Sequence, residues 1–145
     1  ESARLAQATQ ANFRWLGGRP HAETRRRIQR AHLLVNSSLM EGGAHVILEA
    51  VRSGTAVLAS HVAGNIGMLG EAHAGYFEVG DDAALAALIE TACDDALFLA
   101  RLRAAGESRS ALFSPSTEKQ RLHQLVAESL RHAVIHTQTT QETRP

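Results

Sequence analysis

The chain has 145 residues, with 15 basic and 15 acidic side chains and a formal net charge of zero. Its length suits one domain, and its 44% hydrophobic and 21% charged residues are typical of a globular protein, not of a disordered or low-complexity one. No apolar run approaches the roughly 20 residues of a membrane span, which excludes a transmembrane segment. The balanced charge argues against a dedicated nucleic-acid binder, which carries a basic excess. The single cysteine, Cys93, allows no internal disulfide, so we expect a cytoplasmic protein.

The first third of the chain predicts a helix, a strand and a second helix. Residues 2–10 are polar and rich in Ala and Gln, as in a helix. Residues 12–16 alternate between polar and apolar side chains and are followed by two glycines, which predicts a strand. Pro20 lies where a first-turn proline begins a helix, and residues 21–30 continue it. We interpret the four arginines of this helix as a solvated face.

The middle of the chain predicts two buried strands around a helix. Residues 32–35 form a short apolar run and residues 36–43 a polar loop. Residues 44–53 form a helix that Gly54 ends. The remaining expected elements are a strand over 55–59, a loop with one or two helical turns over 63–70, a strand over 75–79, and helices over 82–93, 96–113 and 116–135.

The order of these elements predicts an α/β fold with a Rossmann-like parallel sheet covered by helices on both faces. We expect residues 1–136 to form one partial domain and residues 137–145 a disordered tail. Because the chain begins inside a helix without an initiator Met, we expect an N-terminally truncated piece of a longer protein. Ligands of such sheets bind where the strands end, which directs attention to the loops after the strands.

The loop after the second strand carries the strongest indication of a site. Gly42 and Gly43 allow close approach of the backbone to a ligand, and the following helix start favours phosphate. Glu41 precedes this helix and Glu49 lies about two turns along it, so each can hold sugar hydroxyls. Two glutamates at this spacing also occur by chance on a solvated helix face. Their position between a buried strand and a Gly-Gly helix start favours a site.

Residues 35–60 resemble the sequence signature of the family 4 glycosyltransferases, which reads approximately PS-x-x-EG-x-x-x-x-x-x-EA-x-x-x-G-x-PV-x-A-S/T. The resemblance extends over nearly the whole chain, from the family's "v-x-F-L-G" strand at residues 13–17 to about Leu125. It implies the C-terminal half of a GT-B enzyme, a protein of two Rossmann-like domains in which this half binds the nucleotide-sugar donor.

The resemblance also implies roles for individual residues. Glu41 matches the glutamate that contacts the donor hexose and is our candidate catalytic residue, and Glu49 matches the one that binds the ribose hydroxyls. Ser38 matches the motif serine, while Ser37 replaces the usual proline. The residues expected to offer backbone groups to the sugar and diphosphate are Gly42, Gly43, Ala44 and His45, and those expected at the uracil edge are Gly18 and Arg19.

Three segments, residues 15–21, 40–44 and 64–70, show a narrower resemblance to the selenosugar synthases of selenoneine biosynthesis. That resemblance implies a UDP-hexose donor such as UDP-N-acetylglucosamine or UDP-glucose, and selenophosphate as the acceptor. No cofactor or metal is expected. The alternatives are an ordinary family 4 enzyme with a lipid or glycan acceptor, and a non-catalytic nucleotide-binding α/β module.

The family's diphosphate-binding Arg-Lys pair and its acceptor-binding N-terminal domain would both precede Glu1. We therefore expect a missing N-terminal domain as the partner of this one. We also expect the isolated chain to bind UDP weakly at best and not to turn over.

Overall fold

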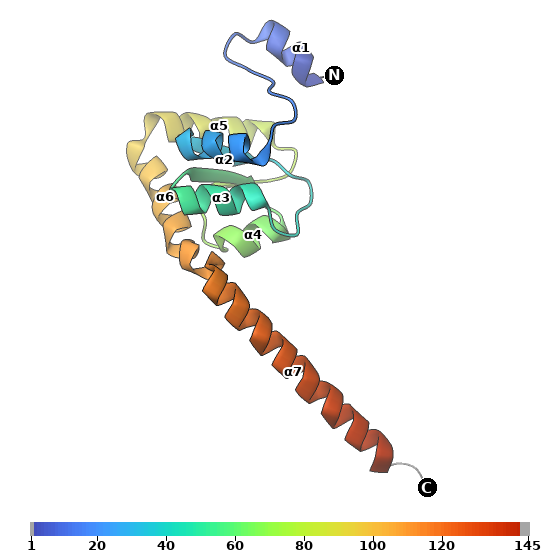
Figure 1. Ribbon diagram of the computed structural model, residues 1–145. Coiled ribbons are helices and arrows are strands. Elements are labelled where there is room, and N and C mark those ends of the chain that lie inside the picture. The colour runs from blue at the N-terminus through green and yellow to red at the C-terminus, as the bar shows by residue number, and fades with distance from the viewer. Residues whose placement is uncertain (1, 143–145) are drawn as a thin grey trace.

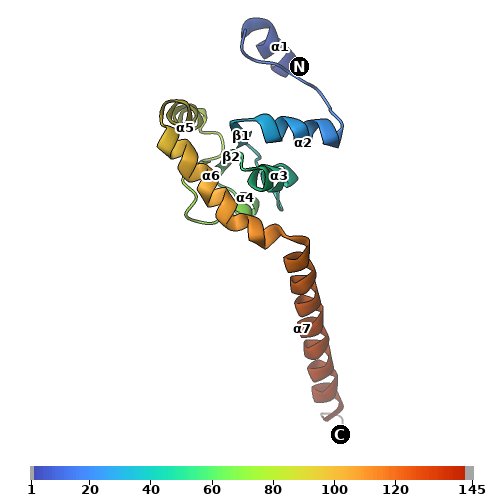
Figure 2. The same cartoon turned by 60° about the vertical axis from the view of Figure 1, so that its left-hand side comes forward.

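The computed structural model describes the backbone of residues 2–142 and the side chains of residues 3–131. Its centre is a three-stranded parallel sheet in the order β1-β2-β3, formed by Leu33–Asn36, Ala56–Ser60 and Tyr76–Phe77. Helices cover the sheet on both sides (Figures 1 and 2). The α/β fold with a parallel, helix-flanked sheet is therefore confirmed.

The central strand β2 determines how the two faces pack, because all five of its residues are buried. Val57 and Ala59 point into a core shared with α2 (His21–Arg30), α3 (His45–Ser53) and α4 (Ala63–Leu69). Ala56 and Leu58 point the other way, toward α5 (Asp82–Asp94) and α6 (Ala96–Ser110). This alternation follows from the two-residue period of a strand, and a strand buried on both faces reads as a continuous apolar run.

Local signals in the sequence fix several helix ends. The Asp81 carboxylate accepts a hydrogen bond from Ala84 N at 2.8 Å and so caps α5. Asp95 caps α6 by accepting from Leu97 N at 2.8 Å and from Phe98 N at 3.0 Å. Gly54 ends α3 in the left-handed conformation with φ of 70°, which a residue with a Cβ rarely adopts. These boundaries agree with the predicted ones to within one or two residues.

The predicted strand over residues 12–16 is wrong. This segment is an irregular connection between α1 (Ser2–Thr9) and α2, and Trp15 is 51% exposed. The segment does alternate between polar and apolar side chains, but no strand of the described residues pairs with it. The N–H of Trp15 donates to Gln7 Oε1 at 2.8 Å instead. A strand without a neighbour cannot satisfy its backbone groups in a ladder, so the sheet has three strands in place of four.

Two other boundaries differ from expectation. The predicted strand over 75–79 shortens to Tyr76–Phe77, because only these residues are in register with the end of β2. The predicted helix over 96–113 divides into α6 and a 3₁₀ turn, Ala111–Phe113. Cys93 is exposed near the end of α5.

The last helix, α7 (Pro115–Glu142), begins at Pro115 and extends beyond the expected end at residue 135. It projects away from the body of the molecule, on the side opposite α1 (Figure 1). The helix thus includes residues 137–142 of the predicted tail, and residues 143–145 lie outside the described part of the chain. Within the described residues, no helix has both the length and the apolarity to cross a membrane.

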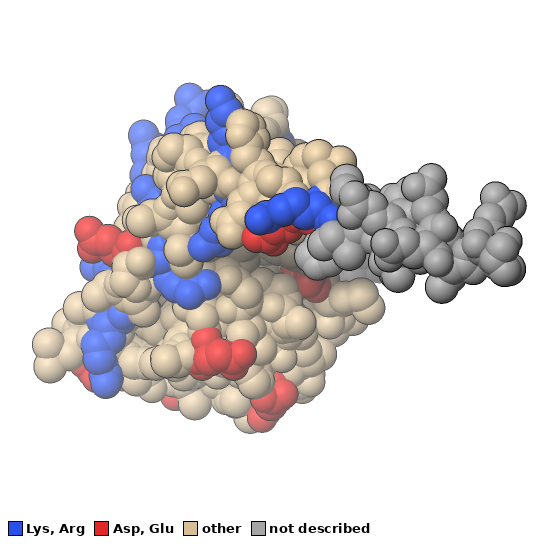
Figure 3. Space-filling view, turned by 90° about the horizontal axis from the view of Figure 1, so that it is seen from below, with Lys and Arg blue, Asp and Glu red and all other residues tan. Residues whose placement is uncertain are grey.

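Charges are distributed over the surface in both signs. The face seen in Figure 3 carries separated basic and acidic side chains, with no continuous field of either sign. This pattern agrees with the zero net charge of the whole chain.

His73 is a buried titratable group of the core, with 6% of its surface exposed. Its Nε2 lies 2.9 Å from the carbonyl oxygen of Val57 in β2, and its Nδ1 has no partner. Burial lowers the pKa of His73, although the hydrogen bond to Val57 partly opposes that effect. The native state therefore holds this ring neutral, while the unfolded chain protonates it near pH 6.5.

We expect the free energy of unfolding to fall as the pH drops below about 6.5, because the unfolded chain then binds a proton that native His73 resists. In the His73→Gln variant this contribution is removed, so its stability deficit relative to wild type should shrink between pH 8 and pH 5. Urea unfolding of both proteins at the two pH values measures the difference. A deficit that stays constant or grows on acidification contradicts the assignment.

Candidate functional site

The loop between β1 and α3 is held at the carboxyl end of the sheet by Ser38. Its hydroxyl oxygen lies 2.7 Å from Glu41 Oε1 and 2.8 Å from Asn36 Oδ1. One hydroxyl proton serves one acceptor at a time, and an ionised carboxylate is the stronger acceptor. The Ser38 hydroxyl therefore donates to the Glu41 carboxylate, while its oxygen stays in contact with Asn36 at the end of β1. Glu41 itself is partly exposed, which leaves it accessible to a ligand.

A set of buried hydrogen bonds also connects this loop to the ends of β1 and β2 and to α4. The hydroxyl of Ser60, at the end of β2, donates to the carbonyl oxygen of Ser38 at 2.6 Å. Asn65 Nδ2 donates to the carbonyl oxygen of Ser60 at 2.9 Å, and Asn36 Nδ2 donates to Asn65 Oδ1 at 3.1 Å. The exposed fractions of Ser60 and Asn65 are 1% and 0%. Because unpaired polar groups are costly when buried, this network strongly favours one position of the loop.

Helix α4 approaches the loop at Gly64. A Cβ at this position would overlap the carbonyl oxygen of Glu41, so only glycine allows the two backbones to lie this close. Tyr76 holds the far end of α4, because its hydroxyl donates to the carbonyl oxygen of Gly70 at 3.0 Å. Burial raises the pKa of Tyr76 to about 12, so the phenol remains a donor at physiological pH.

The start of α3 lies next to this loop and is not capped by a side chain. Ala44 is the N-cap residue, and Gly43 precedes it with φ of 144°, in the region that favours glycine. The first N–H groups of a helix have no partner within the helix and attract anions. A cavity of about 340 Å³ adjoins this helix start. The residues that line the cavity are Gly43, Ala44, His45, Leu48, Met68, Leu112, Phe113, Glu118 and Arg121.

Glu49 lies in a second cavity, a polar groove of about 500 Å³ between α2 and α3. Its side chain is 15% exposed, and its Oε1 lies 2.6 Å from His21 Nε2. The groove is lined by His21, Arg25, Gln29, His45, Leu48, Glu49, Arg52 and Ser53. His45 and Leu48 line both cavities, so the cavity at the helix start and the groove are neighbours along α3.

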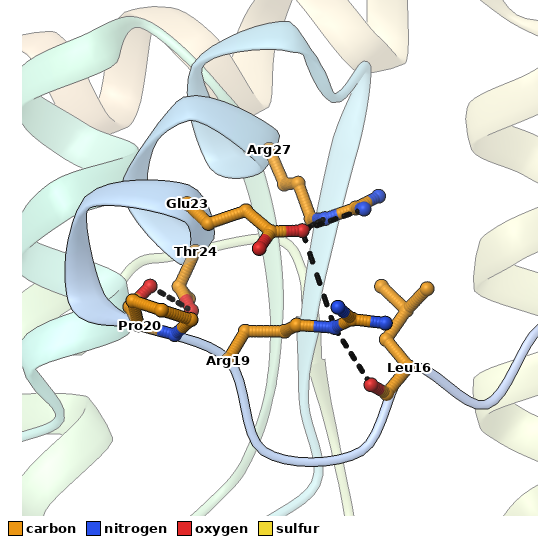
Figure 4. Close-up of polar contacts among 6 residues, drawn as sticks. All are labelled: Leu16, Arg19, Pro20, Glu23, Thr24 and Arg27. Atoms are coloured by element: carbon orange, nitrogen blue, oxygen red, sulfur yellow. Dashed lines mark hydrogen bonds and ion pairs between the residues drawn. The ribbon is translucent and has the colours of Figure 1, made fainter.

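Gly18 and Arg19 line neither of these two cavities. Arg19 Nε donates to the carbonyl oxygen of Leu16 at 2.8 Å and lies 4.0 Å from Glu23 Oε1 (Figure 4). Glu23 also accepts two hydrogen bonds from Arg27, at 3.1 and 2.9 Å. The bonds from Arg27, and then the positive charge of Arg19, lower the pKa of Glu23. Arg19 thus holds the turn that leads into α2.

The structure therefore brings together most of the residues singled out from the sequence. Ser38 and Glu41 are in contact, and Gly42 and Gly43 lead directly into α3. Sequence reasoning missed Asn36, Ser60 and Asn65. The position of Asn36 and Ser60 at the carboxyl ends of β1 and β2 was a usable signal, whereas Asn65 lies within α4. Sequence reasoning also missed the contact of His21 with Glu49. This contact depends on how α2 packs against α3, which no local sequence pattern indicates.

A family model described as "Glycosyl transferases group 1" matches residues 2–109 of the chain. The matched range contains the loop with Glu41, the groove-lining Glu49 of α3, and all three strands. No curated protein matches the chain.

The close approach at Gly64 gives a test of the loop geometry. We expect Gly64→Ala to lower the free energy of unfolding by about 1–3 kcal/mol, because its methyl group displaces the Glu41 backbone. Gly67→Ala is the matched control in the same helix, where an added Cβ meets nothing within 4 Å. It should leave stability unchanged or raise it by up to about 1 kcal/mol. Chemical denaturation compares the two, and equal effects would contradict the geometry.

Proposed function

Because the chain belongs to the group 1 glycosyltransferases, we propose that it is the donor-binding domain of an enzyme that transfers a hexose from a UDP-hexose. The observation that carries this proposal is the presence of one carboxylate just before an uncapped helix start and of a second one in the groove along the same helix. Glu41 is held before the start by Ser38, and Glu49 lies in the groove between α2 and α3. A nucleotide sugar has the same order of groups: sugar hydroxyls, diphosphate and ribose hydroxyls.

Each part of the donor then has a chemically suitable partner. Glu41 accepts hydrogen bonds from hexose hydroxyls, and Glu49 accepts them from the ribose. The backbone N–H groups at Gly42, Gly43, Ala44 and His45 bind the diphosphate. Charge-assisted hydrogen bonds of this kind are stronger than neutral ones, which supports assigning the two carboxylates to hydroxyl pairs.

The transfer step breaks the bond between the anomeric carbon and the UDP oxygen and forms a bond from that carbon to the acceptor. The electron pair of the broken bond leaves with UDP, whose diphosphate gains negative charge. The partial positive charge of the α3 start favours this product. A pure nucleotide-binding module needs no carboxylate at the sugar position, so the position of Glu41 favours an enzyme over that alternative.

We propose selenophosphate as the acceptor, on the sequence resemblance of residues 15–21, 40–44 and 64–70 to the selenosugar synthases. Its selenium atom would attack the anomeric carbon while UDP departs. A lipid or glycan acceptor is the competing assignment within the same family.

The two glutamates give separable binding effects. Glu49→Ala should weaken binding of both UDP and UDP-N-acetylglucosamine, because both carry the ribose. Glu41→Ala should weaken only UDP-N-acetylglucosamine. Each loss should be about 10- to 100-fold, the range for a hydrogen bond to a charged group.

Isothermal titration calorimetry measures these affinities, with Glu90→Ala on the opposite face of the sheet as the control. Unchanged affinity for UDP in Glu49→Ala would contradict the assignment of Glu49 to the ribose. A loss of UDP binding in Glu41→Ala would contradict the assignment of Glu41 to the hexose alone.

The acceptor is tested with the complete protein, UDP-N-acetylglucosamine and selenophosphate. We expect mass spectrometry to detect a hexosamine with the isotope pattern of selenium, formed only when selenophosphate is present and lost in Glu41→Ala. Donor binding without any selenium-containing product would agree with the proposed donor-binding domain but contradict selenophosphate as the acceptor.

A further inference from the structure

The Glu49 carboxylate has a specific partner in the ligand-free groove. Two arginines, Arg25 and Arg52, line the same groove, as does His45. Among the described residues, however, the ion pair of Glu49 within 4 Å is the one with His21, at 2.6 Å. The contact is thus made with His21, although two arginines line the same groove.

The fold holds His21 in place at both ends of its helix. His21 is the first residue of α2, directly after the turn that Arg19 and Glu23 hold together (Figure 4). At the other end, Ile28 is 5% exposed in the core, and its carbonyl oxygen accepts a hydrogen bond from Thr55 Oγ1 at 2.9 Å. Thr55 directly precedes β2. The imidazole is therefore presented to Glu49 by a helix anchored to the sheet.

We propose that His21 is a positioning residue for Glu49, one that orients its carboxylate toward the ribose hydroxyls of the donor. This inference rests on the proposed function, because it assumes that Glu49 binds ribose. A carboxylate has two oxygens and about four acceptor positions. The His21 contact is made with Oε1 alone, so Oε2 is left for one of two neighbouring hydroxyls and Oε1 has further acceptor capacity for the other.

The benefit to binding is conformational. A free glutamate side chain samples several rotamers, and fixing it when the ligand binds lowers the affinity. A carboxylate already fixed by His21 avoids part of that loss. The same contact adds little to the stability of the fold, because His21 is 78% exposed and water can take its place beside the Glu49 carboxylate, whose side chain is 15% exposed. A positioning role therefore predicts an effect on UDP affinity without an effect on stability.

The experiment measures UDP affinity by isothermal titration calorimetry in wild type, His21→Ala, His21→Gln, Glu49→Gln and the double variant His21→Ala/Glu49→Gln. We expect His21→Ala to weaken UDP binding about 3- to 10-fold, at an unchanged melting temperature. His21→Gln, whose amide can still donate to the carboxylate, should restore most of the affinity. His32→Ala, which removes another exposed histidine, is the matched control and should bind UDP like wild type.

A double-mutant cycle then isolates the coupling. In the Glu49→Gln background, His21→Ala should have little further effect, and with 2′-deoxy-UDP its effect should be smaller than with UDP. The proposal is overturned if His21→Ala binds UDP as tightly as wild type, or if its loss persists in full without the Glu49 carboxylate. The proposed function fails separately if Glu49→Gln leaves UDP affinity unchanged or wild type does not bind UDP, and the inference about His21 then falls with it.

Discussion

The completely buried side chain of Asn65 is the constraint on which the site depends. Its amide nitrogen donates to Ser60 at the end of β2, and its amide oxygen accepts from Asn36 at the end of β1. Ser60 in turn holds the backbone of Ser38, which holds Glu41. A shift of the loop would leave several of these buried groups without a partner, so the position of Glu41 is coupled to the register of the sheet.

The two halves of the site are held by different kinds of interaction. The loop half is fixed by buried hydrogen bonds and by the close backbone approach at Gly64. The groove half depends on the packing of α2 against α3, which the apolar core around Ile28 and Ile47 maintains. His21, Arg25 and Arg52 are exposed there, whereas the Glu49 side chain is 15% exposed, so the exposed groups orient this carboxylate more than they stabilise the fold. A donor spanning both halves would contact a rigid sheet edge at its sugar and a helix pair at its nucleoside.

Local signals made most of the fold predictable. Buried apolar runs identified β1 and β2, and the predicted strand over 75–79 contains β3. Asp81, Asp95 and Gly54 marked helix ends that depend only on neighbouring backbone groups. The same reasoning failed at residues 12–16, because alternation shows that a segment can form a strand and not that a partner strand is beside it. The family resemblance drawn from residues 35–60 is confirmed, while the narrower resemblance to selenosugar synthases stays a prediction.

The sequence by itself therefore determined the fold class, the family, and the loop with Glu41 and its following glycines. The family and the loop follow from a pattern within about 25 neighbouring residues. Over such a short segment, the separation of two residues in the sequence largely determines their separation in the structure. Only the tertiary structure decided that Asn65 supports this loop and that His21 contacts Glu49. Each of these contacts joins residues more than 25 positions apart, and such distances are set by the packing of helices on the sheet, which no local pattern encodes.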